Sequence, residues 1–137
     1  MISVTEPVFH FCIRYCNQSG IRVFVVGKGS NCLFDDRGFD GCVILNRIEY
    51  VSALGGGVYE AGGGYPFNQL GIQCSKEGYT GLEFAAGIPG TVGGAVYMNA
   101  GADGQVSWPQ LDFLHIHTRN LSSCSIVCSC RFIIRMK

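Results

Sequence analysis

A nearly uncharged, glycine-rich run occupies residues 81–104 of this chain. Seven glycines fall within the 24 residues of GLEFAAGIPGTVGGAVYMNAGADG, residues 81–104, and alternate with apolar side chains. Pro89-Gly90 fits the centre of a type II turn, whose second residue needs a positive φ, and Thr91 can cap a short helix after it. A helix start presents free backbone N–H groups to an anion. The run therefore predicts a surface for a flat ring with an attached diphosphate, and the alternative is a glycine-rich structural turn.

A second loop has a similar character. Gly27-Lys28-Gly29-Ser30-Asn31 follows the apolar run IRVFVV, and a glycine turn there exposes successive backbone N–H groups that bind phosphate oxygens. Ser30 and Asn31 add side-chain donors, and Lys28 adds a cation unless it points into water. The dinucleotide fingerprint would need glycine in place of Cys32, and the Walker A motif is absent. The loop therefore predicts a phosphate site or, equally, a plain tight turn between two strands.

The remaining pattern predicts one domain with an α+β layout. A helix is expected from Thr5 to Gly20, with one apolar face formed by Val8, Phe9, Cys12, Ile13 and Cys16. Strands are expected at residues 21–27, 42–46, 48–54 and 57–64. A second helix should start near Pro66 and bury Phe67, Leu70 and Cys74, whereas residues 81–90 are expected to form a loop. The order of these elements does not form a clean βαβ repeat.

Charge and cysteine content narrow the range of partners. Ten Lys and Arg balance ten Asp and Glu, so no net charge draws the chain to nucleic acid or an anionic membrane. No run of about 18 apolar residues predicts a membrane span. The eight cysteines would suit a secreted disulfide scaffold, but five of them fit small buried hydrophobic positions: Cys12, Cys16, Cys32, Cys42 and Cys74. The absence of a CxxC pair argues against zinc.

The first residues lack a basic segment followed by an apolar one, so they do not resemble a signal peptide. We therefore expect a cytoplasmic protein, or a plastid protein if the gene is a plant nuclear gene.

Together the two loops carry a family resemblance. VVGKGSNCLFDDRGFDGCVI followed by GLEFAAGIPGTVGGAVYMNAGADG resembles the UDP-N-acetylenolpyruvoylglucosamine reductase, or UDP-N-acetylmuramate dehydrogenase, family. The GxGSN loop, the D-x-G-F-x-G turn, AAGIPG-x-VGGA and MNAGA occur in order, and the resemblance covers about residues 5–105. It implies that residues 1–105 are an incomplete FAD-binding domain of the type found in p-cresol methylhydroxylase and vanillyl-alcohol oxidase.

The resemblance also implies a cofactor and an activity. FAD would be the cofactor and NADPH the reductant, and the family reaction reduces the enolpyruvyl group of UDP-N-acetylglucosamine enolpyruvate to UDP-N-acetylmuramate for peptidoglycan synthesis. The first loop would hold the FAD pyrophosphate, and the second would line the flavin. The residues implied to bind FAD are Gly27, Lys28, Gly29, Ser30, Asn31, Cys32, Gly87, Ile88, Pro89, Gly90, Thr91, Gly93, Gly94, Asn99 and Gly101.

The substrate half of the family pattern is not matched. The family's active-site serine, arginine and glutamate follow the MNAGA motif in a context that Ser107, Arg119 and Ser122 lack, so no catalytic residue is assigned. The UDP-sugar would bind only together with a missing C-terminal domain. We expect the chain alone not to turn over substrate, because half a site leaves the hydride acceptor unpositioned.

Two other functions stay open. One is a non-catalytic FAD- or nucleotide-binding isoform or remnant, and the other is a different FAD-dependent oxidoreductase of the superfamily. His10, His115 and His117 lack the context of a histidine that binds flavin covalently, and the AAGIPG-x-VGG run favours the reductase.

The pattern breaks after Gln105. Residues 106–137 contain no glycine and little regular period, although LDFLHIH alternates as a strand does. The tripeptide Gln-Val-Ser can be encoded by the 5′ boundary sequence of a eukaryotic intron. We therefore raise the hypothesis that residues 106–137 are a translated intron, which predicts an atypical, poorly ordered tail. A genuine lineage-specific C-terminus is the alternative.

Overall fold

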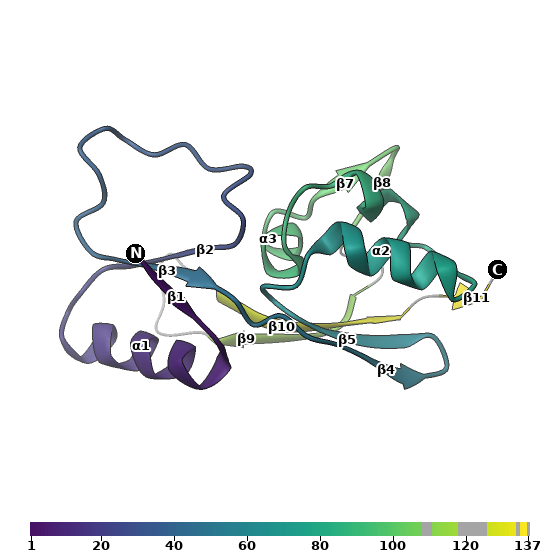
Figure 1. Cartoon of the computed structure of the whole chain (residues 1–137), viewed down its shortest axis with the longest axis horizontal. Helices are drawn as coiled ribbons and strands as arrows, with labels where there is room; N and C mark the ends of the chain where they lie inside the picture. Colours follow the sequence, from purple (N-terminus) through teal and green to yellow (C-terminus); the bar gives the residue numbers. More distant parts are fainter. Residues whose placement is uncertain (108–110, 118–125, 134, 137) are drawn as a thin grey trace.

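The structure is a computed structural model that describes residues 1–107, 111–117, 126–133 and 135–136. Figure 1 shows the two larger sheets following one another along the molecule, with α1 at one end and α2 and α3 over the other. This mixture of helices and strands confirms the expected α+β class. Within the described residues, no helix is both long enough and apolar enough to cross a membrane.

The first sheet is parallel, in the order β1-β3-β2, with β1 at Ile2–Val4, β2 at Val23–Val26 and β3 at Cys42–Asn46. Parallel neighbours need a long connection, and α1 (Glu6–Gln18) carries the chain from β1 to β2. Ile44 of β3 lies between Ile2 of β1 and Val25 of β2 in the register. The sequence predicted β2 and β3 but missed β1, because a three-residue strand has too little pattern to recognise.

Helix α1 covers this sheet with one apolar face. Thr5 is its N-cap residue, and Gly20 follows the C-cap with φ +68°, as a glycine beyond a helix end commonly does. Phe9, Ile13 and Cys16 are buried as predicted, whereas Val8 is 47% exposed. The core of this layer is completed by Val4, Ile44 and Ile48.

The second sheet is antiparallel, in the order β4-β5-β10-β9. Its strands are β4 (Val51–Gly55), β5 (Val58–Gly62), β9 (Leu111–His117) and β10 (Ile126–Ile133). The strand expected at LDFLHIH is confirmed as β9. Residues beyond Gln105 therefore contribute two strands to this sheet, while the domain boundary at that residue and the intron origin of the tail stay predictions.

Helix α2 (Phe67–Lys76) packs its predicted apolar face on this half of the molecule. The remaining elements are β6 (Tyr79–Thr80), the 3-10 helix η1 (Glu83–Gly87), α3 (Val92–Tyr97), β7 (Gly101–Ala102), β8 (Gln105–Val106) and β11 (Arg135–Met136). The main core consists of Tyr59, Ala61, Phe67, Leu70, Cys74, Leu82, Phe84, Ala85, Val92, Ala95 and Val96. Because these side chains come from β5, α2, η1 and α3, the core holds the glycine-rich run against the sheet.

Two local predictions in the glycine-rich run are wrong. Residues 81–90 are not simply a loop, because they include η1, whose Glu83 carboxylate accepts hydrogen bonds from the Thr80 hydroxyl and the Gly81 amide, both at 2.6 Å. Gly90 does not adopt a positive φ, so Pro89-Gly90 does not form a type II turn. The Gly90 amide instead donates to the Ile88 carbonyl at 2.9 Å, and this tighter turn directs the chain into α3.

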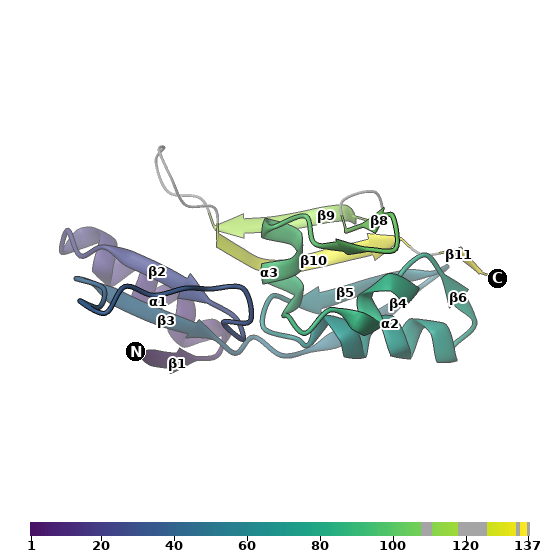
Figure 2. The same ribbon diagram turned by 90° about the horizontal axis from the view of Figure 1, so that it is seen from above.

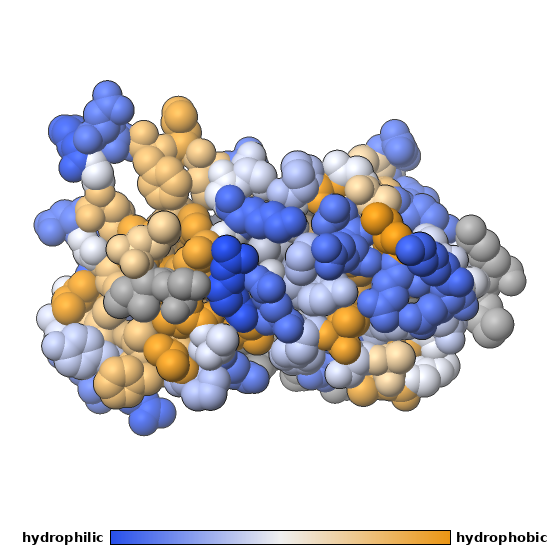
Figure 3. All heavy atoms as spheres, viewed as in Figure 1, coloured by the Kyte–Doolittle hydropathy of each residue, from blue (hydrophilic) through white to orange (hydrophobic). Residues whose placement is uncertain are grey.

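The loop between β2 and β3 leaves the first sheet and projects from it (Figure 1). Both ribbon views place the start of this loop beside α3, where the two sheets meet (Figure 2). In Figure 3 apolar residues gather on the projecting loop, whereas hydrophilic residues dominate the surface over α2. Leu33 is fully exposed and Phe34 is 51% exposed, so the loop carries uncovered apolar side chains.

Candidate functional site

A hollow of about 380 Å³ lies between the loop after β2 and the start of α3. This volume falls in the range of small-molecule and cofactor sites. Eleven predicted residues line it together: Gly27, Lys28, Gly29, Ser30, Asn31, Cys32, Ile88, Gly90, Thr91, Gly93 and Gly94. The Gly27–Asn31 loop and the glycine-rich run, which were predicted separately as ligand-binding segments, therefore face one common space. We call this space the loop cavity.

Four predicted residues do not line the loop cavity: Gly87, Pro89, Asn99 and Gly101. Two of them have structural roles instead. Asn99 adopts a left-handed conformation with φ 45° and donates its amide to the Val96 carbonyl at 3.1 Å, which ends α3. A side chain at Gly101 would overlap the Gln105 carbonyl oxygen across the β7–β8 pair. Within the MNAGA segment, Asn99 and Gly101 thus shape the backbone, while Met98 and Ala100 line the cavity.

The two walls of the loop cavity touch at Gly27 and Thr91. A Cβ atom at Gly27 would overlap the Thr91 hydroxyl oxygen, so only glycine lets the strand end approach the helix this closely. The same hydroxyl oxygen accepts a hydrogen bond from the Gly94 amide at 3.3 Å and caps α3, as predicted. Thr91 is 4% exposed, so this contact is a buried junction between the two loops.

Two other glycines face open space. Gly29 has φ +71°, which favours glycine, and a Cβ atom there would meet no other atom within 4 Å. At Gly90 a Cβ atom would make only ordinary contacts, at 3.9 Å to Ile88 and to the Ser30 hydroxyl oxygen. Neither backbone conformation nor packing within the protein requires glycine at position 90. The absence of a side chain leaves room for a ligand beside the backbone.

The cavity wall combines one charge, several polar groups and apolar flanks. Among the described residues that line it, Lys28 alone carries a charge, and it is exposed. Ser30, Asn31 and Thr91 contribute hydroxyl and amide groups. Such a wall suits a ligand with an anionic part and a flat apolar part.

Sequence reasoning missed part of this wall. The additional lining residues are Phe24, Val25, Val26, Asn46, Gly63, Ala95, Tyr97, Met98 and Ala100. Asn46 is the most informative of them, because it ends β3, is 4% exposed, and accepts the Ile48 amide hydrogen on its side-chain oxygen at 2.9 Å. The sequence signal that could have identified Asn46 is its position as the polar last residue of the apolar run CVILN. This run forms β3, which pairs with β2, the strand that leads into the Gly27 loop.

The cysteine prediction holds for only part of its set. Cys16 and Cys74 are buried, Cys12 and Cys42 are half-buried, and Cys32 is exposed at the cavity. In the part of the chain that the structure describes, no group of three or more potential metal ligands comes together.

A second hollow, of about 370 Å³, lies on α2 and is lined by Tyr65, Gln69, Ile72, Gln73, Lys76 and Glu77. At its edge the Tyr59 hydroxyl donates a hydrogen bond to the Glu77 carboxylate. This bond lowers the pKa of Glu77, whereas burial, followed by the bond to the carboxylate, raises the pKa of Tyr59. Burial also raises the pKa of the nearby Cys74 thiol to about 12. Tyr59 and Cys74 belong to the core under α2, whereas Glu77 is exposed at the end of that helix, and none of the three lines the loop cavity.

Comparison with known proteins agrees with the geometry of the loop cavity. A family described as FAD binding domain matches residues 9–117, which include both cavity loops and β9. Over 101 residues the chain is 52% identical to UDP-N-acetylenolpyruvoylglucosamine reductase of Protochlamydia amoebophila and 48% identical to that of Chlamydia trachomatis serovar D. Each match covers 74% of this chain and 34% of the relative, so the chain spans about a third of the length of these curated relatives.

A solved structure shows the same fold. The crystal structure of UDP-N-acetylenolpyruvylglucosamine reductase from Thermus caldophilus matches 99% of this chain and 56% of that chain, with a TM-score of 0.79 and 22% sequence identity. The family match extends over more than half of the residues, and the expected type of FAD-binding fold is therefore confirmed. This chain belongs to the FAD binding domain family and is a relative of the UDP-N-acetylenolpyruvoylglucosamine reductases.

Proposed function

We propose that the loop cavity binds FAD and that this chain is the FAD-binding portion of an NADPH-dependent reductase of UDP-N-acetylglucosamine enolpyruvate. The observation that carries the proposal is made at Gly90, which lines the cavity. Its backbone is not in the left-handed region, and a Cβ atom there would make no close contact within the protein, so the fold itself does not require glycine at this position. The match to the FAD binding domain family identifies which ligand would need that space.

The residues present fit such a ligand. Backbone groups of the Gly27–Asn31 loop and the segment 90–94 would face the diphosphate, with the Ser30 hydroxyl and the Asn31 amide as further donors. Phe24, Tyr97 and Met98 supply apolar surface in the same cavity. Bound FAD would supply hydride-transfer chemistry, and the protein groups would hold and orient it.

We also propose that this chain binds FAD without turning over the UDP-sugar. No carboxylate or imidazole lines the loop cavity among the residues whose placement is described. Reduction of an enolpyruvyl group requires a positioned proton donor as well as a hydride, and alignment of reactants supplies roughly 7–11 kcal/mol in favourable cases. The alternative is a non-catalytic FAD-binding isoform. Such an isoform would stay inactive even when the substrate-binding part of the reductase is supplied, whereas the FAD-binding portion of a reductase would then become active.

One preparation tests both proposals. The purified chain is mixed with FAD, separated from free cofactor by gel filtration, and examined for flavin absorbance. NADPH oxidation is then followed with the UDP-sugar present. We expect retained flavin and no substrate-dependent NADPH oxidation. A colourless protein that elutes as a folded species would contradict the FAD proposal, and sustained substrate-dependent oxidation would contradict the proposal that this chain lacks turnover.

A further inference from the structure

Lys28 is the one charged residue among the described residues that line the loop cavity. It is exposed, and it takes part in neither of the two ion pairs found in the described part of the chain, which are Asp35–Arg37 at 2.7 Å and Arg47–Glu49 at 2.9 Å. A cavity with one unpaired cation and no lining anion favours a negatively charged ligand.

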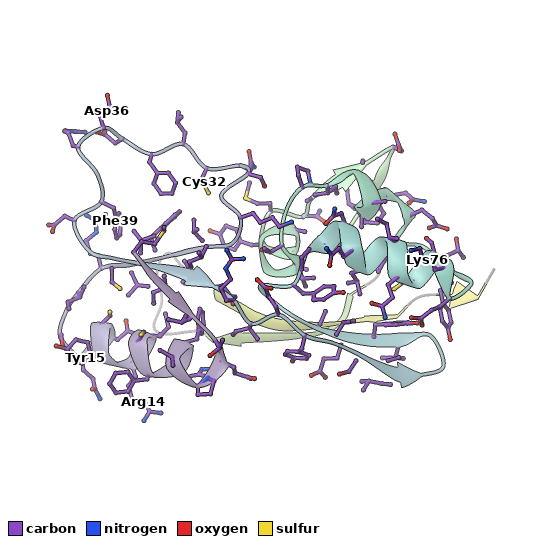
Figure 4. All side chains as sticks on the ribbon, in the orientation of Figure 1. Arg14, Tyr15, Cys32, Asp36, Phe39 and Lys76 are labelled. Carbon is purple, nitrogen blue, oxygen red and sulfur yellow. The ribbon has the colours of Figure 1, made fainter. Side chains whose placement is uncertain are left out.

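Among the described residues, no ion pair joins Lys28 to Asp35, Asp36 or Asp40, the acidic residues of the same loop. The Asp35 carboxylate is held by the Arg37 guanidinium, through bonds of 2.9 Å from Nε and 2.7 Å from Nη2. Asp36 lies at the outer tip of the projecting loop, whereas Cys32 lies on the limb that borders the cavity (Figure 4). The positive charge of Lys28 therefore remains available to the cavity.

The backbone on both sides of Lys28 is fixed, so the base of its side chain has a defined position. Gly27 packs against the buried Thr91, and the Cys32 amide closes the turn by donating to the Gly29 carbonyl at 3.3 Å. The flexible four-carbon side chain of lysine can then bring its ammonium group to an anion held by the neighbouring backbone N–H groups.

We propose that Lys28 determines the specificity of the loop cavity for the diphosphate of its ligand, so that the cavity discriminates FAD from riboflavin, which has no phosphate. This inference rests on the proposed function, because it assumes that the cavity binds a flavin. It adds that one side-chain charge, rather than the glycine backbone alone, selects the charged form of that flavin. Because Lys28 is exposed, salt should screen its contribution.

The test is a calorimetric titration of the full chain with FAD and with riboflavin, at low and at high salt. Lys28→Met removes the charge and keeps a side chain of similar length, and Lys28→Arg keeps the charge. Lys76→Met is the matched control, because Lys76 is also exposed but lies on α2, away from the cavity limb marked by Cys32 (Figure 4). Thermal unfolding of each variant confirms that it is folded.

At low salt, we expect Lys28→Met to weaken FAD binding by about tenfold, as for loss of a charge-assisted contact. Its riboflavin affinity should change less than about twofold, and its FAD affinity should depend less on salt than that of the wild type. Lys28→Arg and Lys76→Met should bind FAD as the wild type does.

The proposal is overturned if Lys28→Met keeps the wild-type FAD affinity and salt dependence, or if it weakens FAD and riboflavin equally. In both cases a wild-type chain that binds FAD still supports the proposed function. A folded wild-type chain that binds no FAD contradicts the proposed function and this inference with it.

Discussion

Two groups of glycines in this molecule appear alike in the sequence and differ in the structure. Gly62 and Gly64 stand where β5 passes the connection from β3 to β4, and a Cβ atom at either position would collide with backbone, at Ile48 or at Asn46. Gly29 and Gly90 border the loop cavity, and a Cβ atom there would meet open space or ordinary contacts. The first pair lets two chain segments pack, and the second leaves room for a ligand.

A glycine can serve either close packing or ligand access, and the surroundings of the missing Cβ atom distinguish the two. The Gly64 amide donates to the Ile48 carbonyl at 3.0 Å, and the Gly62 amide donates to the Tyr50 carbonyl at 2.9 Å. These bonds give the backbone N–H groups of both glycines hydrogen-bond partners within the protein. Gly29 has a positive φ that favours glycine, but glycine at position 90 has no comparable explanation within the protein, and the family match to an FAD binding domain supplies one.

The largest effect on the free energy of unfolding is expected from a substitution at Gly62, where two chain segments pack closely. Gly62→Ala should lower the free energy of unfolding by about 3 kcal/mol, because its Cβ atom would overlap the Ile48 carbonyl oxygen and force backbone to move. Urea unfolding followed by circular dichroism measures this change. Equal stability of the variant and the wild type would show that the glycines at the crossing are not needed for packing.

Alkaline pH should weaken the main core beneath α2. The Cys74 pKa is raised from 9.0 to about 12 in the folded protein, so the stability linked to its neutral thiol is fully present below pH 9 and is lost as the pH rises toward 12. At a pH midway between these values the loss is on the order of 2 kcal/mol. The raised pKa of Tyr59 acts in the same direction.

Unfolding in urea at a series of pH values measures this loss, and Cys74→Ala should make the stability less dependent on pH. A Cys74→Ala variant that loses as much stability as the wild type between pH 9 and 12 would assign the effect to other groups.

A smaller effect is expected at the junction of the two cavity walls. Thr91→Ala removes the cap of α3 and should cost about 1 kcal/mol, since its hydroxyl oxygen accepts the Gly94 amide hydrogen. Thr91→Ser keeps the hydroxyl and should retain most of that stability. Thermal unfolding of the two variants separates the cap from the methyl group, and equal losses in both would assign the effect to packing of the methyl group.

The smallest effect on stability is expected at Gly90, in the second pair of glycines. Gly90→Ala should change the free energy of unfolding by less than about 0.5 kcal/mol, because Gly90 is not in a left-handed conformation and its surroundings accept a Cβ atom. Measured in the same urea experiment as Gly62→Ala, it gives the contrast between the two glycine groups directly. A loss as large as that of Gly62→Ala would mean that the glycine at position 90 serves the fold.

Much of the fold could be predicted from periodicity. The i, i+3, i+4 spacing in α1 and α2 predicted Phe9, Ile13, Phe67 and Leu70 as core residues, and all four are buried. Strand β1 was not predicted, because its pairing partner lies some forty residues away in the sequence, at Ile44 in β3. Tertiary pairing, not local pattern, makes a strand of so short a segment.

The site could be predicted in part. The Gly27–Asn31 loop and the segment 90–94 carry local signals, and the structure brings them together. The conformation of Gly90 was predicted wrongly, because Pro-Gly fits several turn types and the neighbouring α3 selects another. Tyr97 could not be predicted as a wall residue, because it joins the wall only when α3 comes beside the loop. Asn46 had a local signal, as the polar end of the apolar run CVILN, but its place in the wall depends on β3 lying beside β2.

Calorimetric titration of FAD into the wild-type chain and into a folded Gly90→Val variant tests directly whether the loop cavity binds FAD. The valine side chain would enter the loop cavity at a position where the fold tolerates a Cβ atom. The cavity account predicts that the wild type binds FAD and that Gly90→Val, while folded, binds it at least about tenfold more weakly. Equal FAD affinity of the two folded proteins, or no binding by the wild type, would contradict it.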